Sequence, residues 1–392
     1  MMTGRFPVES FQQIDTPFYY YDLDLLRHTL GIIADYAPEP NFHVHYALKA
    51  CAVPEVLREI VSAGLGADCV SGGEIRAALE AGVPAGRIVF AGVAKADWEI
   101  ALALDSDILC FNVESVEELE VISNMAAGRG KTARVCLRVN PDIDAHTHQN
   151  ITTGLADNKF GIQMSDLQRA IEVCCLLPNI EFLGLHFHIG SQITDMQPFR
   201  NLCMRINTLV EQTEQSGVIV RHINVGGGLG INYEHPNHIP VADFEAYFNV
   251  FRRMLNLRPE QTLHFELGRS VVAPCGSLIT RVLYVKQGKE KQFAIVDAGM
   301  TDLIRPALYN AFHRIENISN NGPVDETYDV VGPICESSDV FVRNFSMAVA
   351  HRGDLLAIRS AGAYGEIMAS QYNLRRLPGH ITSDNIGKLK KK

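Results

Sequence analysis

The stretch that decides the fold is FHVHYALKA, residues 42–50, which carries Lys49 next to its end. Aromatic and branched residues alternate through it with a period of two, which is typical of a short β-strand. Counting back in twos from Lys49 gives Ala47, His45 and His43, so these four side chains are expected on one face. An amine at the end of a buried strand is costly to desolvate unless it is paired, neutralised or used. Lys49 is therefore the first candidate for a functional site.

Similar short strands recur along the chain, each followed by a segment of helix length. They are expected near residues 43, 66, 88, 108, 133, 182, 222 and 262. Eight parallel strands alternating with helices are the pattern of a (β/α)8 barrel of about 250 residues, in which the chemistry lies at the C-terminal ends of the strands. The sequence thus predicts an α/β fold with a barrel over residues 25–266.

After Arg269 the pattern changes to short alternating strands with turn signals between them. Examples are SLITRVLYVKQ (277–287) and KQFAIVDAG (291–299). Such runs are typical of an all-β domain. We expect this domain to comprise residues 1–24 and 267–392, with the aromatic segment at 16–24 adding a strand.

The composition narrows the class of partner. The chain has 392 residues, long enough for two domains, and a net charge of −10, which argues against nucleic acid or an anionic membrane. Nine cysteines without a C-x-x-C pair indicate reduced thiols. The N-terminal stretch lacks the apolar segment of a signal peptide, and no apolar run approaches about 20 residues. We expect a cytoplasmic protein whose partner is a small molecule.

The sixth and seventh strands end in residues suited to an anion. HFHIGSQ (186–192) supplies His188 and Ser191, and NVGGGLG (224–230) supplies Gly226–Gly228. Consecutive glycines let backbone N–H groups approach an anion closely, and barrels often bind phosphate in the loops after strands 7 and 8. The alternative for the glycines is a tight turn, but at this place in the fold a phosphate site is the better interpretation.

The eighth strand ends in ELGR, with Glu266 and Arg269. A carboxylate opposite Lys49 is compatible with a structural ion pair. It is also what pyridoxal 5'-phosphate (PLP) requires, since this cofactor takes a lysine, a phosphate cradle and often an acidic partner for its ring nitrogen. The residues at the strand ends supply all three, so the sequence favours a PLP site.

Three H-x-H pairs suggest a competing metal site. They are His43 and His45, His146 and His148, and His186 and His188. Barrel metallohydrolases also use histidines at strand ends. No aspartate ligand of the usual kind was identified, and three glycines have no place in such a site. We therefore predict no metal, with core or stacking roles for residues 186 and 188 and loop positions for 146 and 148.

With YALKA, HFHIGSQ, GGG and ELGR in this order, the chain resembles the PLP-dependent decarboxylases of the alanine-racemase fold (fold type III), and among them the branch that acts on meso-2,6-diaminopimelate. The resemblance runs from about residue 16 to 375. Four further segments carry it: TGLADNKFGI (153–162), MTDLIRPALYNAFH (300–313), GPICESSDVF (332–341) and GAYGEIMASQYN (362–373).

The resemblance implies a role for each matching residue. Lys49 would carry PLP as a Schiff base, His188 would stack on its ring, and Glu266 would pair with the ring nitrogen. The phosphate and the rest of the cofactor would be held by Ser191, Gly226, Gly227, Gly228, Gly268, Arg269 and Tyr364. The substrate would be bound by Arg269, Arg305, Tyr309, Glu336 and Tyr364. Cys335, the expected proton donor, and Glu336 would come from the second subunit of a homodimer with shared active sites.

The implied reaction is the conversion of meso-2,6-diaminopimelate to L-lysine and CO2, the last step of lysine biosynthesis. Arg forks recognise carboxylates, so a site built around a second carboxylate would reject substrates that lack it. Alternatives are decarboxylation of arginine, ornithine or carboxynorspermidine, a racemase, and a non-catalytic PLP-binding protein. The chain departs from the family pattern at Leu267, Glu366 and Gln371, which leaves fine specificity open.

Overall fold

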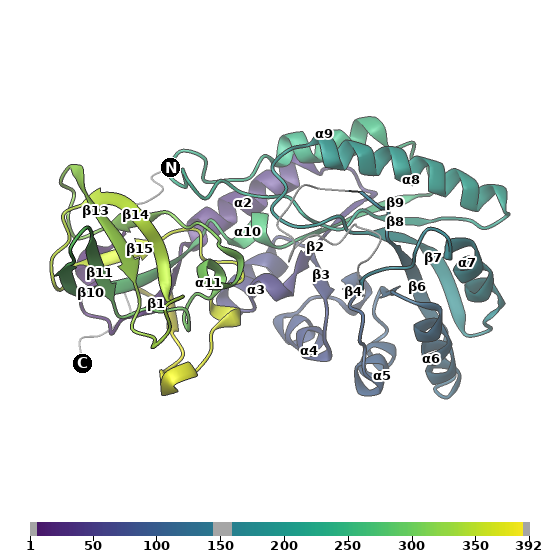
Figure 1. The fold of residues 1–392 in the computed structure, drawn as a ribbon. Coiled ribbons are helices and arrows are strands. Elements are labelled where there is room, and N and C mark those ends of the chain that lie inside the picture. Colours follow the sequence, from purple (N-terminus) through teal and green to yellow (C-terminus); the bar gives the residue numbers. More distant parts are fainter. Residues whose placement is uncertain (1–5, 144–158, 387–392) are drawn as a thin grey trace. The chain divides into compact units, whose positions relative to one another are not determined.

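The computed structural model describes residues 6–143 and 159–386, and the chain divides into two compact units (Figure 1). The barrel unit comprises Leu30–Gly230 and Asp243–Gly268, and the β unit comprises Met1–Thr29, Ile231–Ala242 and Arg269–Lys392. The expected barrel range of 25–266 included residues 231–242, which group with the β unit in this structure. The segment belongs to the β unit because its side chains bond there, as Asn237 does with Glu316 and Arg359.

Eight strands of the described residues close into a parallel barrel, which confirms the predicted (β/α)8 architecture. Each strand pairs with its neighbours in the chain, and the last pairs with the first, for example at His45 opposite Glu266. The strands are β2 (Phe42–Ala47), β3 (Gly66–Cys69), β4 (Ile88–Phe90), β5 (Cys110–Val113), β6 (Ala133–Val139), β7 (Ile180–Phe187), β8 (His222–Asn224) and β9 (Thr262–Leu267).

The helices between the strands begin and end where the sequence provides caps. Ser71 and Ser115 accept hydrogen bonds from the N–H groups of Glu74 and Glu118 at 3.2 Å, which are capping interactions of the S-x-x-E pattern. Gly82, at φ 98°, ends one of these helices. The helices with residues in this unit are α2 (Leu23–Tyr36), α3 (Pro54–Ser62), α4 (Gly72–Ala81), α5 (Asp97–Ser106), α6 (Val116–Ala127), α7 (Leu167–Leu176), α8 (Gln197–Gln215) and α9 (Phe244–Met254), with short turns η1 (Leu48–Ala50) and η2 (Ala85–Arg87).

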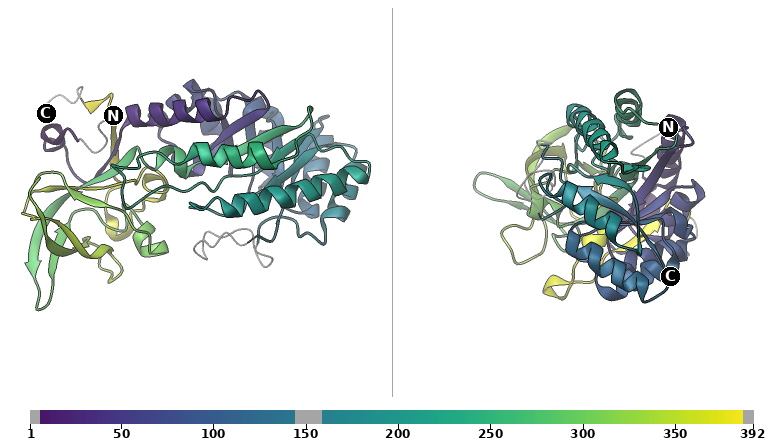
Figure 2. Two further views of the ribbon diagram at one scale, coloured as in Figure 1. Left: turned by 90° about the horizontal axis from the view of Figure 1, so that it is seen from above. Right: turned by 90° about the vertical axis from the view of Figure 1, so that its right-hand side faces the viewer.

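An aromatic cluster under α8 and α9 fixes this side of the barrel. The two helices pack side by side (Figures 1 and 2). Tyr247 and Phe251 of α9 contact Phe199 of α8 and Phe265 of β9 with ring centroids 5.0 to 6.0 Å apart. These rings bury large apolar areas and hold strand β9, which carries Glu266, in place.

The β unit is built on one mostly antiparallel sheet, as predicted. Its strand order is β12-β15-β10-β11-β13-β14, and β1 from the N-terminal segment pairs with β10 and β16. Figure 1 labels β1, β10, β11, β13, β14 and β15 of this sheet. The elements are α1 (Val8–Phe11), β1 (Phe18–Tyr21), α10 (Arg269–Val272), β10 (Gly276–Gln287), β11 (Gln292–Val296), α11 (Arg305–Tyr309), β12 (Ile315–Asn317), β13 (Val324–Val331), β14 (Val340–Ala348), β15 (Leu355–Ile358), η4 (Glu366–Met368), η5 (Tyr372–Leu374) and β16 (Gly379–Thr382).

No helix within the described ranges is long and apolar enough to cross a lipid bilayer.

Candidate active site

Lys49 lies at the C-terminal end of β2, but not on the strand itself. The strand ends at Ala47, and residues 48–50 form the single turn η1. The predicted period-two face therefore does not extend to Lys49. Its Nζ is 3.3 Å from Oδ2 of Asp68, which is fully buried at the end of β3. The lysine side chain is 38% exposed, so its amine lies where a small molecule can reach it.

Asp68 is a member of the site that the sequence analysis missed. Its Oδ1 is buried and has no hydrogen-bond partner among the described residues. Burial and the nearby charge of Glu266 raise the pKa of Asp68 to about 6, although Lys49 works in the opposite direction. Its Oδ2, 3.3 Å from the Lys49 amine, accepts a hydrogen bond that positions this amine.

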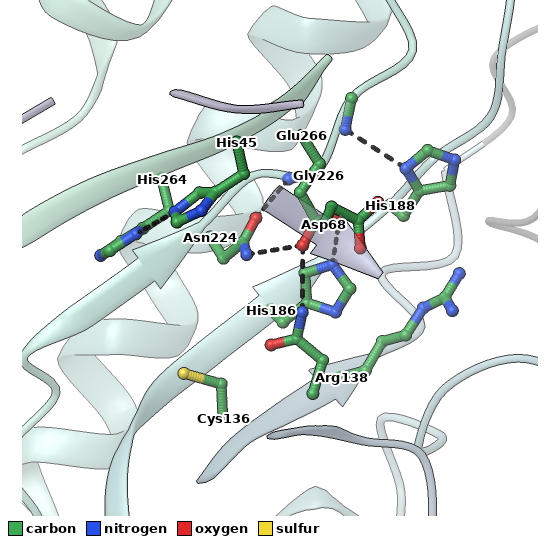
Figure 3. Close-up of polar contacts among 12 residues, drawn as sticks. His45, Asp68, Cys136, Arg138, His186, His188, Asn224, Gly226, His264 and Glu266 are labelled. Carbon is green, nitrogen blue, oxygen red and sulfur yellow. Dashed lines mark hydrogen bonds and ion pairs between the residues drawn. The ribbon is translucent and has the colours of Figure 1, made fainter. Parts of the chain in front are cut away.

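Glu266, in strand β9, is held by three N–H donors from three other strands of the barrel, β5, β7 and β8 (Figure 3). Asn112 Nδ2 and Asn224 Nδ2 donate to Oε1 at 3.0 and 2.8 Å, and His186 Nε2 donates to Oε2 at 3.0 Å. Burial alone would raise the pKa of Glu266, but His186, Lys49 and His188 hold it below its ordinary value. The carboxylate is ionised, and Oε2 keeps room for a further N–H donor because a carboxylate oxygen accepts about two bonds.

The loops after β7 and β8 are joined to each other. Ile193 N donates to Gly228 O and Gly230 N donates to Ile193 O, both at 2.9 Å, which places the segment containing Ser191 beside Gly226–Gly228. The N–H of Gly227 donates to Nδ1 of His188 at 3.3 Å. Burial, with Lys49 and Arg138 nearby, lowers the pKa of His188 well below its usual value, so the ring is neutral. A neutral imidazole can stack on an aromatic cofactor.

The glycines have a packing reason of their own. A Cβ on Gly227 would lie 1.9 Å from Glu266 O, and one on Gly226 would lie 2.2 Å from Phe187 O. The backbone therefore needs glycine here with or without a phosphate. Gly268 is similar, because a Cβ there would lie 3.1 Å from the Cβ atoms of Ala47 and Ala50, the residue after Lys49.

The donor set fits PLP. The Lys49 amine, beside the unpartnered Asp68 Oδ1, suits the aldehyde of the cofactor. The ionised Glu266 can accept a hydrogen bond from its ring nitrogen, and the neutral His188 can stack on its ring face. Within residues 6–143 and 159–386 no cluster of three or more His, Cys, Asp or Glu side chains is arranged to hold a metal ion. His146, His148 and residues 153–158 lie outside the described residues.

The β unit brings together the predicted carboxylate-binding residues. Arg269 in α10 and Arg305 in α11 are buried, 6% and 5% exposed. The Arg269 guanidinium lies 4.9 Å above the ring of Tyr364, whose backbone adopts the left-handed region at φ 56°. Tyr309, the last residue of α11, is close enough to contribute to the raised pKa of Arg269, although burial works against that shift.

Cys335 and Glu336 are exposed between β13 and β14 and are tied to the turn η5. Cys335 N donates to Asn373 Oδ1 at 3.2 Å, and Tyr372 OH donates to Glu336 Oε1 at 2.7 Å. The departure at Glu366 has a local explanation. Its two carboxylate oxygens accept from Tyr21 OH at 2.9 Å and bond His380 Nδ1 at 2.8 Å, all within the β unit.

Comparison with known proteins defines the class. Residues 31–273 match the family described as pyridoxal-dependent decarboxylase, pyridoxal binding domain. The chain belongs to this family of PLP-dependent decarboxylases. The curated relatives point to one activity within this family. The diaminopimelate decarboxylase of Bacteroides thetaiotaomicron is 61% identical over 98% of this chain and all of its own length. That of Neisseria meningitidis serogroup B is 42% identical over 94% of this chain and 88% of its own length.

Solved structures agree. The crystal structure of diaminopimelate decarboxylase from Helicobacter pylori complexed with L-lysine superposes with a TM-score of 0.90 at 39% identity, and covers 98% of this chain and 94% of that one. Within the PLP-dependent decarboxylases, the chain belongs to the diaminopimelate decarboxylases.

A histidine cluster lies in the barrel wall, away from the strand ends that carry Lys49 and Asp68. His264 stacks between His45 and His222, with ring centroids 5.2 and 4.6 Å away. His45 Nδ1 lies 3.1 Å from the carbonyl of Arg87, so it carries a hydrogen, and its Nε2 accepts from His264 Nδ1 at 2.9 Å. These bonds require neutral rings.

This cluster predicts acid sensitivity. Burial lowers the pKa of His45 to about 4, while an unfolded histidine titrates near 6.5. Between these values the unfolded state binds more protons, so the free energy of unfolding falls as the pH drops, by about 3 kcal/mol in total for His45. The raised pKa values of Asp68 and Glu74 have the opposite effect on the free energy of unfolding as the pH drops. The contribution of His45 is therefore measured by comparing the wild type with a His45 variant.

His45→Gln is therefore expected to reduce the slope of unfolding free energy against pH by up to about 1.4 kcal/mol per pH unit between pH 6.5 and 4. Urea unfolding at several pH values measures this slope. Replacement of the exposed His28 by glutamine is the matched control. An unchanged slope for His45→Gln would show that the buried rings do not resist protonation.

Proposed function

We propose that this chain, with PLP, removes CO2 from one α-carbon of meso-2,6-diaminopimelate and yields L-lysine. The observation that carries the proposal is an amine and an ionised buried carboxylate, Lys49 and Glu266, at the strand ends of one barrel. The names of the relatives support the substrate, and three related structures hold L-lysine, the expected product. The test is equal formation of CO2 and L-lysine from meso-diaminopimelate, with ornithine and arginine as competing substrates.

The residues assigned to the cofactor have distinct tasks. PLP, when bound, supplies an electron sink for the electron pair left on the α-carbon as CO2 departs. Lys49 Nζ would hold its aldehyde carbon, Glu266 Oε2 its ring N–H and His188 its ring face. We assign the phosphate to Ser191, Gly226, Gly227, Gly228 and Tyr364, and we also assign Gly268 and Arg269 to the cofactor.

Asp68 and Glu266 assist these tasks through their carboxyl groups. Asp68 accepts a hydrogen bond from Lys49 Nζ at 3.3 Å and would orient this nitrogen toward the cofactor. Glu266 stays ionised because His186 donates to it, and an ionised acceptor keeps a ring nitrogen protonated.

The second carboxylate of the substrate is assigned to Arg269, Arg305 and Tyr309. Burying two guanidinium groups away from water is costly unless an anion binds them. A ligand that lacks this carboxylate does not provide that anion. Where a site is built around one polar group, such ligands can be rejected by about 10⁴-fold. Glu336 is assigned to the distal amine. The requirement for a second carboxylate separates diaminopimelate from lysine, ornithine and arginine as substrates.

We further propose a cytoplasmic homodimer in which Cys335 and Glu336 act in the partner's site. Exposure of both residues and of the neighbouring Leu374, which is 97% exposed, leaves this surface available to a second copy. The nine cysteines are free thiols, in keeping with a reducing compartment. Cys335 would donate the proton that replaces CO2.

A complementation experiment tests the shared site. Cys335→Ser alone is expected to lower kcat by about 10²- to 10⁴-fold, the usual contribution of a general acid. Mixing it with inactive Lys49→Ala, after unfolding and refolding together, should recover up to about a quarter of wild-type activity, because half of the dimers are mixed and each has one intact site. No recovery, with dimers confirmed by sedimentation, would contradict sharing.

A further inference from the structure

The Tyr233 hydroxyl lies between the guanidinium groups of Arg269 and Arg305. None of the roles assigned above involves Tyr233. It belongs to the 231–242 segment of the β unit and follows the glycine-rich loop in sequence. Its hydroxyl oxygen is 2.8 Å from Nη1 of Arg269 and 2.9 Å from Nη1 of Arg305. The Arg305 guanidinium also lies 5.1 Å from the centre of the Tyr233 ring. One phenol thus sets the spacing of both guanidinium groups.

The hydrogen-bond directions in this cluster can be assigned. His313 Nδ1 lies 2.8 Å from the carbonyl of Arg359, so it carries the hydrogen and His313 Nε2 accepts from Arg305 Nη1 at 3.0 Å. Arg305 is thereby held on one side by His313 and on the other by Tyr233. His313 itself packs edge-on against the Tyr233 ring at 5.0 Å.

The Tyr233 oxygen accepts both N–H groups, because a guanidinium can only donate. Each described hydrogen bond of this hydroxyl is one that it accepts, and its own hydrogen remains for an acceptor. Arg305 also keeps a donor, since its buried Nε has no partner within the described ranges, and no ion pair of Arg305 occurs there. Two donor groups of the cluster, the Tyr233 hydroxyl and Arg305 Nε, therefore have no acceptor among the described residues and suit an anionic oxygen.

We propose that Tyr233 is a specificity-determining residue for substrates with a second carboxylate: its hydroxyl holds Arg269 and Arg305 at a fixed spacing and donates its own hydrogen to the carboxylate they bind. This rests on the proposed function of the site. The preformed spacing lowers the cost of assembling a carboxylate receptor, and the hydroxyl adds a donor.

The proposal has a pH signature. Burial would raise the pKa of Tyr233, but Arg269 and Arg305 outweigh it and lower the pKa below the ordinary value of tyrosine. The titratable and charged groups packed around the hydroxyl are Arg269, Arg305 and His313, with Tyr364 and Tyr309 beside Arg269. Once Tyr233 ionises it can no longer donate and it competes with the substrate for both arginines. The KM for diaminopimelate should therefore rise at alkaline pH.

The test is Tyr233→Phe in the PLP-loaded enzyme, with 1,5-diaminopentane as the competitive inhibitor, because it has both amines of the substrate but no carboxylate, whereas L-lysine keeps the second carboxylate. We expect the KM for meso-diaminopimelate to rise by about 10- to 100-fold, as for loss of a hydrogen bond to a charged group. We expect kcat and the inhibition constant of 1,5-diaminopentane to change by less than about 3-fold, and the alkaline rise in KM to disappear. Tyr284→Phe, on the exposed face of β10, is the matched control.

Other outcomes are distinguishable. An unchanged KM overturns the proposal. A parallel rise in KM and in the inhibition constant of 1,5-diaminopentane, with a lower melting temperature, shows a structural role only and also overturns it. If Tyr233→Phe does not fold, the alkaline rise in KM of the wild-type enzyme still decides, because its absence contradicts a donating hydroxyl. Failure of the wild-type enzyme to decarboxylate diaminopimelate refutes the proposed function instead.

Discussion

Replacement of Lys49 by alanine is expected to lower the decarboxylation of meso-diaminopimelate by at least about 10³-fold and to remove the visible absorbance of bound cofactor. The reason is that Lys49 offers an accessible amine at the strand ends of the barrel, 3.3 Å from Asp68. Absorbance spectra after reconstitution with PLP, together with CO2 release, measure both effects.

Lys95 cannot take over this task. Its Nζ is buried and donates to Gly92 O, Asn112 O and Glu118 Oε1 at 2.8, 2.9 and 2.5 Å, which uses all three hydrogens of the ammonium group. The exposed Lys289, in the turn after β10, is the matched control for Lys49→Ala. A Lys49→Ala enzyme that kept its absorbance and turnover would place the cofactor elsewhere.

Glu266→Gln is expected to lower kcat by about 10²- to 10³-fold while the absorbance of bound cofactor persists. The amide removes the charge that keeps a ring nitrogen protonated, and it places an N–H2 group where His186, Asn112 and Asn224 all donate. The amine of Lys49 is still present in this variant, so the cofactor should still bind.

Steady-state kinetics with the reconstituted variant measure this effect. Glu120→Gln, on the exposed face of α6, controls for the loss of one carboxylate. A melting temperature within a few degrees of wild type would show that the fold is intact. A kcat within about 3-fold of wild type would contradict the role assigned to Glu266.

The strand-end rule accounts for most of what the sequence could predict. Because parallel barrel strands end at one face, Lys49, His188, Ser191 and Glu266 could be assigned to one site from residues far apart in the chain. The period-two pattern failed beyond Ala47, because the chain turns into η1 there and local alternation cannot detect such a turn.

The partners of these residues were harder to predict. Asp68 and Asn112 also lie at strand ends, and the same rule would have found them, but short polar residues are equally common in turns. Tyr233 gave no local signal at all. Its contacts with Arg269 and Arg305 join residues 36 and 72 positions apart, and they depend on the 231–242 segment leaving the barrel for the β unit.

The most direct test of the central claim is a single incubation of the purified chain with PLP and meso-diaminopimelate, in which CO2 and L-lysine are measured together. We predict that both form in equal amounts, that ornithine and arginine give at least about 10³-fold less product, and that neither product forms without PLP. Equal or faster turnover of ornithine or arginine, or no CO2 from diaminopimelate after full reconstitution, would contradict the account.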